Sequence, residues 1–156
     1  MALLANLSAQ EIKAWFPRLR MEAVKKTSEA TEEYNCFAWA AGDQTRKWDW
    51  TSRPGEAGRF WPAHLDRNGD LHDFVNLYTT EAGYSTCDSG ELEQGFEKIA
   101  LYVGGDNEVK HAARQLSNGL WTSKLGDYED IEHDLSTLEG GGYGSVKQFL
   151  KRPTRI

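Results

Sequence analysis

The stretch EEYNCFAWAAG (residues 32–42) places a cysteine, Cys36, directly before a run of small and aromatic residues. Such a run is typical of a short buried helix, which the cysteine would open. At the first turn of a helix, unpaired backbone N–H groups and the positive end of the helix dipole favour a thiolate. A second stretch, VKHAARQL (residues 109–116), carries His111 on an expected strand. The chain order is thus a cysteine that opens a helix, then a histidine on a later strand.

Composition indicates one ordinary soluble domain, residues 1–156. Of the 156 residues, 39% are hydrophobic and 27% are charged, which is enough to bury a core. The net charge is −6, from 18 Lys and Arg against 24 Asp and Glu, which argues against nucleic acid or an anionic membrane as partner. No apolar run approaches the ~20 residues of a membrane span. We expect neither nucleic acid nor a membrane as partner.

The start of the chain, MALLANLSAQEI (residues 1–12), lacks the basic and long apolar regions of a signal peptide. We therefore expect a cytoplasmic protein, although a protein delivered by a dedicated secretion machine would look the same. Cys36 and Cys87 are the only cysteines, and we expect no disulfide between them in a reducing compartment. Two thiols are too few for a zinc site without histidine, and we predict no metal and no cofactor. A group of His64, His72, Asp66 and Asp70 has no fixed geometry that would gather a metal.

Periodicity predicts helices in the first half of the chain. A capping box at Ser8 begins a short helix that ends at Pro17, and Asp70 begins a longer one that ends at Gly83. Residues 18–33 are rich in Arg, Lys and Glu, which favours an exposed connector. Cys87 falls in the polar loop after the second of these helices.

Alternation of apolar and polar residues replaces the helical period from residue 97 on. Three strands of an antiparallel meander are predicted at 97–103, 109–116 and 120–126. Residues 127–139 are acidic, with a short helix expected around 131–138, and YGSVKQFLKR (residues 143–152) suits a last strand. The predicted fold class is therefore α+β, with N-terminal helices packed on a C-terminal antiparallel sheet.

The segment WDWTSRPGEAGRFWP (residues 48–62) holds three tryptophans and a phenylalanine without a helical or alternating period. Such a loop cannot form a core alone, so its aromatic side chains must dock on the domain. Two interpretations follow: the loop walls a substrate cleft, or aromatic packing simply pins it.

A thiol nucleophile works best with an imidazole that raises the thiolate fraction and a third polar group that orients the imidazole. If residues 117–119 form a three-residue loop with a left-handed glycine, Ser123 shares a sheet face with His111. If only Asn118 and Gly119 form the turn, Ser123 lies on the opposite face. The face of His111 is then shared by Gln115, Thr122 and Lys124 instead. The following segment offers further candidates for the third group: Asp130, Glu132 and His133.

The motifs NCFAWAAG, EKIALYVG, HAARQL, WTSKLGD and YGSVKQFLKR resemble, in this order, those of a group of little-characterised bacterial domains. The resemblance covers about residues 30–153. The arrangement is similar to the papain-like superfamily, particularly its compact branch of bacterial cell-wall amidases and endopeptidases. It implies a papain-like fold with Cys36 as nucleophile, His111 as base and Ser123 in the third place. That place is more usually His, Asn, Gln or Asp in the family.

Other residues are candidates for supporting roles in such a site. Asn35 and Gln115 are candidates to support the oxyanion or orient the base, with helix capping as the alternative for Asn35. Arg114 could steer an acidic substrate, or form a surface salt bridge. Four residues are candidates to line a substrate cleft: Trp39, Trp61, Trp121 and Lys124.

The leading functional hypothesis is a cysteine-dependent hydrolase or acyltransferase acting on an amide of a peptide, a cell-wall crosslink or a protein glutamine. A toxin-like effector, or an intracellular amidase or deamidase, fits the lack of an export signal. The alternative is a non-catalytic binding module that recognises a partner through residues 48–62. The serine in the third place and the acidic residues Glu29, Glu32 and Glu33 before Cys36 favour that alternative. A third hypothesis, an immunity or inhibitor protein, is supported only by the negative net charge of the chain.

Overall fold

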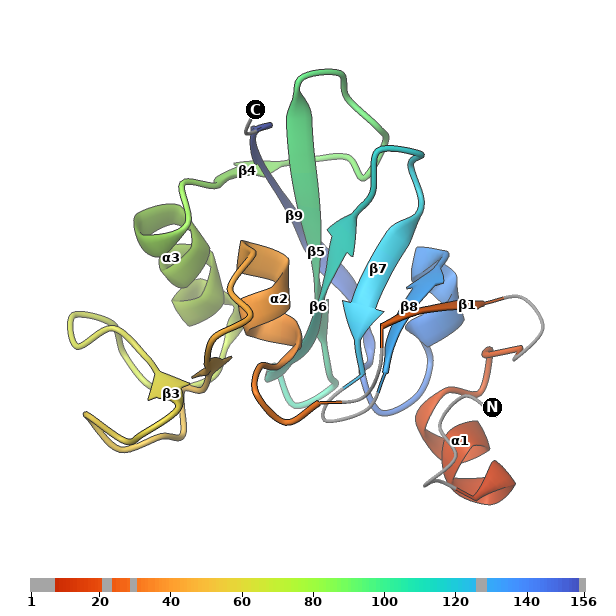
Figure 1. Cartoon of the computed structure of the whole chain (residues 1–156), viewed down its shortest axis with the longest axis horizontal. Coiled ribbons are helices and arrows are strands. Elements are labelled where there is room, and N and C mark those ends of the chain that lie inside the picture. Colours follow the sequence, from red (N-terminus) through yellow and green to blue (C-terminus); the bar gives the residue numbers. More distant parts are fainter. Residues whose placement is uncertain (1–7, 21–23, 29–30, 126–128, 155–156) are drawn as a thin grey trace.

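A computed structural model describes residues 8–20, 24–28, 31–125 and 129–154. Across these residues, seven strands form one sheet in the order β1-β8-β7-β6-β5-β9-β4, and every neighbouring pair is antiparallel (Figure 1). The strands are β1 (Lys25–Ser28), β4 (Ser85–Cys87), β5 (Phe96–Val103), β6 (Val109–Gln115), β7 (Trp121–Lys124), β8 (Asp130–His133) and β9 (Ser145–Pro153).

Helices lie on both sides of this sheet, so the fold is α+β as predicted. Helices α2 and α3 lie on one side and α1 on the other, where the 3₁₀ helix η2 also packs (Figure 1). A separate two-stranded parallel pair, β2 with β3, lies beside α2. The bounds are α1 (Ala9–Trp15), α2 (Cys36–Ala41), α3 (Leu71–Glu81), η2 (Leu135–Leu138), β2 (Lys47–Trp48) and β3 (Arg59–Phe60).

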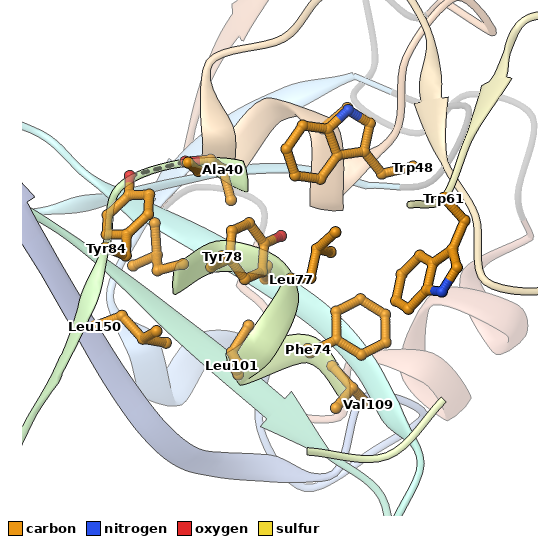
Figure 2. Packing of buried hydrophobic residues seen from close by; sticks show 14 of the residues in the cluster. Ala40, Trp48, Trp61, Phe74, Leu77, Tyr78, Tyr84, Leu101, Val109 and Leu150 are labelled. Carbon is orange, nitrogen blue, oxygen red and sulfur yellow. Dashed lines mark hydrogen bonds between the residues drawn. The ribbon is translucent and has the colours of Figure 1, made fainter. Parts of the chain in front are cut away.

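Alternate residues of β5 point to opposite faces of the sheet and divide the core in two. On the α2 and α3 side, Leu101 packs with Phe74 and Leu77 of α3, and all three are fully buried (Figure 2). Burying a side chain of this size stabilises the fold by roughly 1.5–3 kcal/mol. On the other side, Tyr102 packs in a second cluster with Leu138 of η2.

Two local predictions are confirmed at the residues that carried them. The Asp70 side chain caps α3 by accepting a hydrogen bond from the Asp73 N–H (3.0 Å), and Gly83 follows with a φ of +75°. In the hairpin between β6 and β7, the Leu116 N–H donates to the Leu120 carbonyl (2.7 Å), and Gly119 has a φ of +88°. The three-residue loop is therefore the correct alternative.

Three predictions of secondary structure are wrong. Residues 18–33 contain the edge strand β1, whose polar sequence gave no alternating signal. Residues 131–138 do not form one helix. Residues 131–133 belong to β8, which pairs with β7, and only Leu135–Leu138 form the short 3₁₀ helix η2. Cys87 ends strand β4 instead of lying in a loop.

The tryptophan-rich segment is pinned to the domain. Trp48 and Trp61 are both buried in the first cluster, where Trp61 packs edge-on against Phe74 (5.3 Å between ring centroids). The Trp61 indole N–H donates to the Asp66 carbonyl (3.0 Å). Within the described ranges, no helix is long and apolar enough to cross a membrane.

Candidate functional site

Helix α2 is held in place by hydrogen bonds from its neighbours, because six residues are too few for a stable helix in water. The Asn35 side chain accepts from the Ala38 N–H (3.0 Å) and from the Trp48 N–H (3.1 Å), and thereby ties the start of α2 to β2. The capping interpretation of Asn35 is thus confirmed. Carbonyl groups of α2 accept hydrogen bonds from three distant side chains: Tyr78, Tyr84 and Arg152.

Cys36 is a free thiol, nearly closed off from solvent at the first position of α2. Burial raises the pKa of the Cys36 thiol to about 12, against the opposing effects of hydrogen bonds from the backbone of Ala112 and Phe37 and of the Lys124 charge. The environment therefore keeps the thiol protonated at neutral pH, although several nearby groups favour the thiolate.

The sulfur lies where β6 and β7 separate. The two strands pair only at Arg114 with Thr122 and at Gln115 with Trp121. Continued in register, Ala112 would face Lys124, but the pairing ends before these residues. The Ala112 backbone there favours the thiolate form of Cys36.

Lys124 is fully buried, so the expectation that it lines an open substrate cleft is wrong. Its ammonium lies 5.6 Å from the centre of the Tyr34 ring. The Tyr34 hydroxyl donates to a carboxylate oxygen of Asp130 (3.0 Å), and Asp130 pairs with Lys124 in the register of β7 and β8. Lys124, Asp130 and Tyr34 therefore form a buried polar group, and the Lys124 charge acts on Cys36.

His111 is fully buried on the opposite face of β6. Its neighbour Ala112 packs with α2, whereas the His111 ring stacks on Tyr143 (4.2 Å between centroids, 3° between planes) and meets Tyr102 edge-on. Neither ring nitrogen of His111 has a hydrogen-bond partner among the described residues. Burial, and then the nearby His133, lowers the pKa of His111 well below its usual value.

The thiol and the imidazole are not joined, and Tyr143 is a shared neighbour. Cys36 contributes, after burial, to the raised pKa of Tyr143, the ring that stacks on His111. However, no hydrogen bond links the Cys36 sulfur to His111 in the described part of the chain. The structure therefore does not assemble the expected thiolate–imidazolium pair in this conformation.

Ser123 lies on the His111 side of the sheet but bonds a different histidine. Its hydroxyl is 2.6 Å from His133 Nε2, and His133 Nδ1 is 2.7 Å from the Asp134 carbonyl. Because a carbonyl can only accept, Nδ1 carries the proton and Nε2 accepts from Ser123. Burial lowers the pKa of His133 to about 4, so the ring is neutral at pH 7. From the sequence, His133 was only one of several candidates for the third polar group, because the strand that carries it could not be placed.

A cavity of about 360 Å³ lies beside Trp39, one helical turn after Cys36, and we call it the Trp39 cavity. The Arg114 guanidinium lies over the Trp39 ring (5.1 Å to the centroid). The indole Nε1 of Trp39 and the Oε1 of Gln115 are buried without a hydrogen-bond partner among the described residues. The other lining residues are Leu92, Phe96, Glu97, Leu116, Ser117, Thr122 and Thr154.

The remaining candidates have other positions. Trp121 is buried in the second cluster, beside Phe149, and Trp61 is buried in the first, so neither lines the Trp39 cavity. The Gln115 side chain donates to the Gly90 carbonyl (2.8 Å), so it does not orient His111. Of the four predicted cleft residues, Trp39 lines the cavity.

One group of potential metal ligands lies at the start of α3: Asp70, His72 and Asp73, with one ligand atom of each within 4.8 Å of the others. The Asp70 carboxylate already accepts from the Asp73 N–H, and the Asp73 carboxylate accepts from the Asn68 N–H (2.7 Å). Both carboxylates therefore serve the helix start, and His72 is largely exposed.

Comparison with known proteins gives one match. Residues 25–151 match the model of a family described as a domain of unknown function (DUF7689). No match was found among curated proteins, and none among solved structures.

Proposed function

As the chain belongs to the DUF7689 family, whose function is unknown, we propose from its own geometry that it is a binding domain whose ligand occupies the Trp39 cavity. The observation that carries the proposal is the buried, unpartnered indole Nε1 of Trp39, whose side chain lines this cavity. Leaving such an atom without a partner costs roughly 1–3 kcal/mol, which a ligand with matching groups would recover.

The cavity itself has the character of a ligand site. Its volume of about 360 Å³ falls within the usual range of roughly 300–1,000 Å³ for such sites. Its wall combines four aromatic or aliphatic residues with six polar or charged ones. The tryptophans of residues 48–62 are packed into the domain. We therefore propose the Trp39 cavity as the recognition site in place of that segment.

The test is a screen of small acids, amides and amines by the indole N–H resonances of the ¹⁵N-labelled protein. Trp39→Phe assigns the Trp39 resonance. A ligand in the cavity should shift this resonance and leave that of Trp15, which is half exposed on α1, unchanged. If no compound shifts the Trp39 resonance at millimolar concentration, the binding proposal fails.

A second candidate is a cysteine-dependent amide hydrolase or acyltransferase on a papain-like fold, acting on a peptide or protein. The unpartnered nitrogens of His111 and the backbone hydrogen bonds to the Cys36 sulfur favour it. In such a reaction, Cys36 would attack the amide carbonyl and form a thioester, and His111 would protonate the departing amine. Water or another acceptor would then release the acyl group.

Alkylation with iodoacetamide separates the two candidates. In a Cys87→Ser background, a thiol with a pKa near 12 should resist labelling until the protein unfolds. Labelling of native Cys36 below pH 7 that is lost in His111→Ala would instead support the hydrolase. We also propose a cytoplasmic location, because both cysteines are free thiols.

A further inference from the structure

We propose that residues 140–144 form a lid over His111, and that the segment 8–18 holds this lid shut. The inference goes beyond the binding function of the Trp39 cavity, because it concerns access to a different site. It draws on three separate features: the ring that covers His111, the glycines on both sides of that ring, and the contacts that the N-terminal segment makes with them.

The cover is the ring of Tyr143, which lies flat on the His111 imidazole with 4.2 Å between centroids and 3° between planes. His111 is fully buried, and neither of its ring nitrogens has a hydrogen-bond partner among the described residues. A neutral imidazole carries one donor and one acceptor, so both remain unsatisfied while the cover is in place. This loss favours an open arrangement, in which water or a ligand with a donor and an acceptor, such as an amide, reaches the ring.

The segment that carries the cover has glycine at each end. Gly140 and Gly144 have φ angles of +88° and +74°, and the Gly140 N–H donates to the Gly144 carbonyl (2.9 Å). Tyr143 is the only residue between them with a large side chain, in the run GGGYG. Glycine passes between left-handed and right-handed backbone conformations at little cost, so these two positions suit a hinge that moves residues 141–143 together.

The N-terminal segment holds the lid from outside. The Gly142 N–H donates to the Trp15 carbonyl (3.0 Å). The next residue, Phe16, is buried and packs edge-on against the Tyr143 ring (5.2 Å between centroids). The end of α1 thus fixes both the backbone of the lid and its tyrosine.

This hold is reversible. Helix α1 has only seven residues and buries none of them, so it has little stability of its own. Every strand of the sheet in the described ranges begins at or after Lys25, and the family match also begins there. The segment 8–18 can therefore move while the strands stay paired.

The test is labelling of the full chain with diethyl pyrocarbonate at neutral pH, located by mass spectrometry of peptides. The reagent acylates accessible, unprotonated imidazole nitrogens. His72, whose side chain is 78% exposed, is the reactive standard. His133 is the protected standard, because it is buried and hydrogen-bonded to Ser123. In the unaltered protein, we expect His111 to be as protected as His133.

Gly141→Ala displaces the N-terminal segment, because the new methyl would collide with the Trp15 carbonyl and the Pro17 ring. We expect the labelling rate of His111 to rise about tenfold or more, with His133 unchanged. The matched control is Gly105→Ala. It also adds a methyl to a loop glycine, but nothing lies within 4 Å of that methyl, so His111 should stay protected.

Tyr143→Ala removes the cover itself and should expose His111 by a similar factor, so the result does not depend on whether Gly141→Ala folds. The lid is overturned if His111 stays protected in Tyr143→Ala, if His133 gains reactivity with it, or if His111 already reacts as fast as His72 in the unaltered protein. Protection that survives only in Gly141→Ala overturns the role of the N-terminal segment. The labelling needs no activity, so the lid can stand even where alkylation of Cys36 contradicts the hydrolase.

Discussion

The two buried histidines predict a loss of stability between pH 7 and pH 5. Burial lowers the pKa of His133 to about 4 and that of His111 well below its usual value of 6.5. The unfolded chain therefore binds protons that the folded chain does not, and the free energy of unfolding falls as the pH drops through 6.5. A change of one pH unit is worth about 1.36 kcal/mol for each such group.

The magnitude follows from these values. At about pH 5, which is 1.5 units below 6.5, His133 costs about 2 kcal/mol, and His111 adds a further loss of the same sign. For His133 alone, the loss levels off at about 3 kcal/mol near its folded pKa of about 4. Carboxylates whose pKa is lowered, such as Asp43 with a pKa of about 2, contribute their losses mainly below pH 4.5. Between pH 7 and pH 5, the loss in the free energy of unfolding therefore comes from the two histidines.

Urea unfolding followed by tryptophan fluorescence, at a series of pH values, measures this slope. His133→Gln should remove about 2 kcal/mol of the loss at pH 5, and His111→Gln should reduce the loss as well. His72→Gln, at a histidine that is 78% exposed, is the control and should leave the slope unchanged. A stability that stays flat from pH 7 to pH 5, or a slope that survives in both buried variants, would refute the reasoning.

Three further substitutions test the packing. Phe74→Ala removes a fully buried ring between Phe37 and Trp61, and should lower the urea-unfolding free energy by roughly 3–5 kcal/mol; less than 1 kcal/mol would contradict the packing. Tyr102→Phe removes the hydroxyl that donates to the Leu135 carbonyl (2.8 Å) and should cost about 1–3 kcal/mol in the same assay, whereas no change would mean that water satisfies that carbonyl. Gly144→Ala should cost about 2 kcal/mol or more and speed amide exchange at the start of β9, because φ is +74° and the new methyl would collide with the Val103 carbonyl; wild-type exchange would contradict this.

The sequence predicted those parts of the fold whose conformation depends on a few neighbouring residues. The cap at Asp70 and the left-handed Gly119 act within a few residues, so their sequence suffices. Strands β1 and β8 were missed because pairing creates them: the acidic Asp130 becomes a buried strand residue only when it lies opposite Lys124.

In the candidate site, too, the sequence predicted what depends on neighbouring residues and missed what depends on strand pairing. Chain order and turn geometry correctly placed Ser123 on the His111 face, but its hydrogen bond to His133 depends on the register of β8 with β7. The Trp39 cavity depends on residues from α2, β5, β6 and β7 together with the loop that holds Leu92. Arg114 was assigned only to steering or a surface salt bridge, since no pattern in the sequence brings it over Trp39.

The position of β9 in the sheet has a consequence for synthesis on the ribosome. β9 lies between β5 and β4, and it pairs with β5 along nearly its whole length. Strands β4 and β5 are synthesised before β9, so the growing chain carries an open β5 edge and a β4 without its neighbour. Such distant pairing is slow. The emerging chain therefore depends on its hairpin of β5 and β6 to shield apolar residues until the late strand inserts.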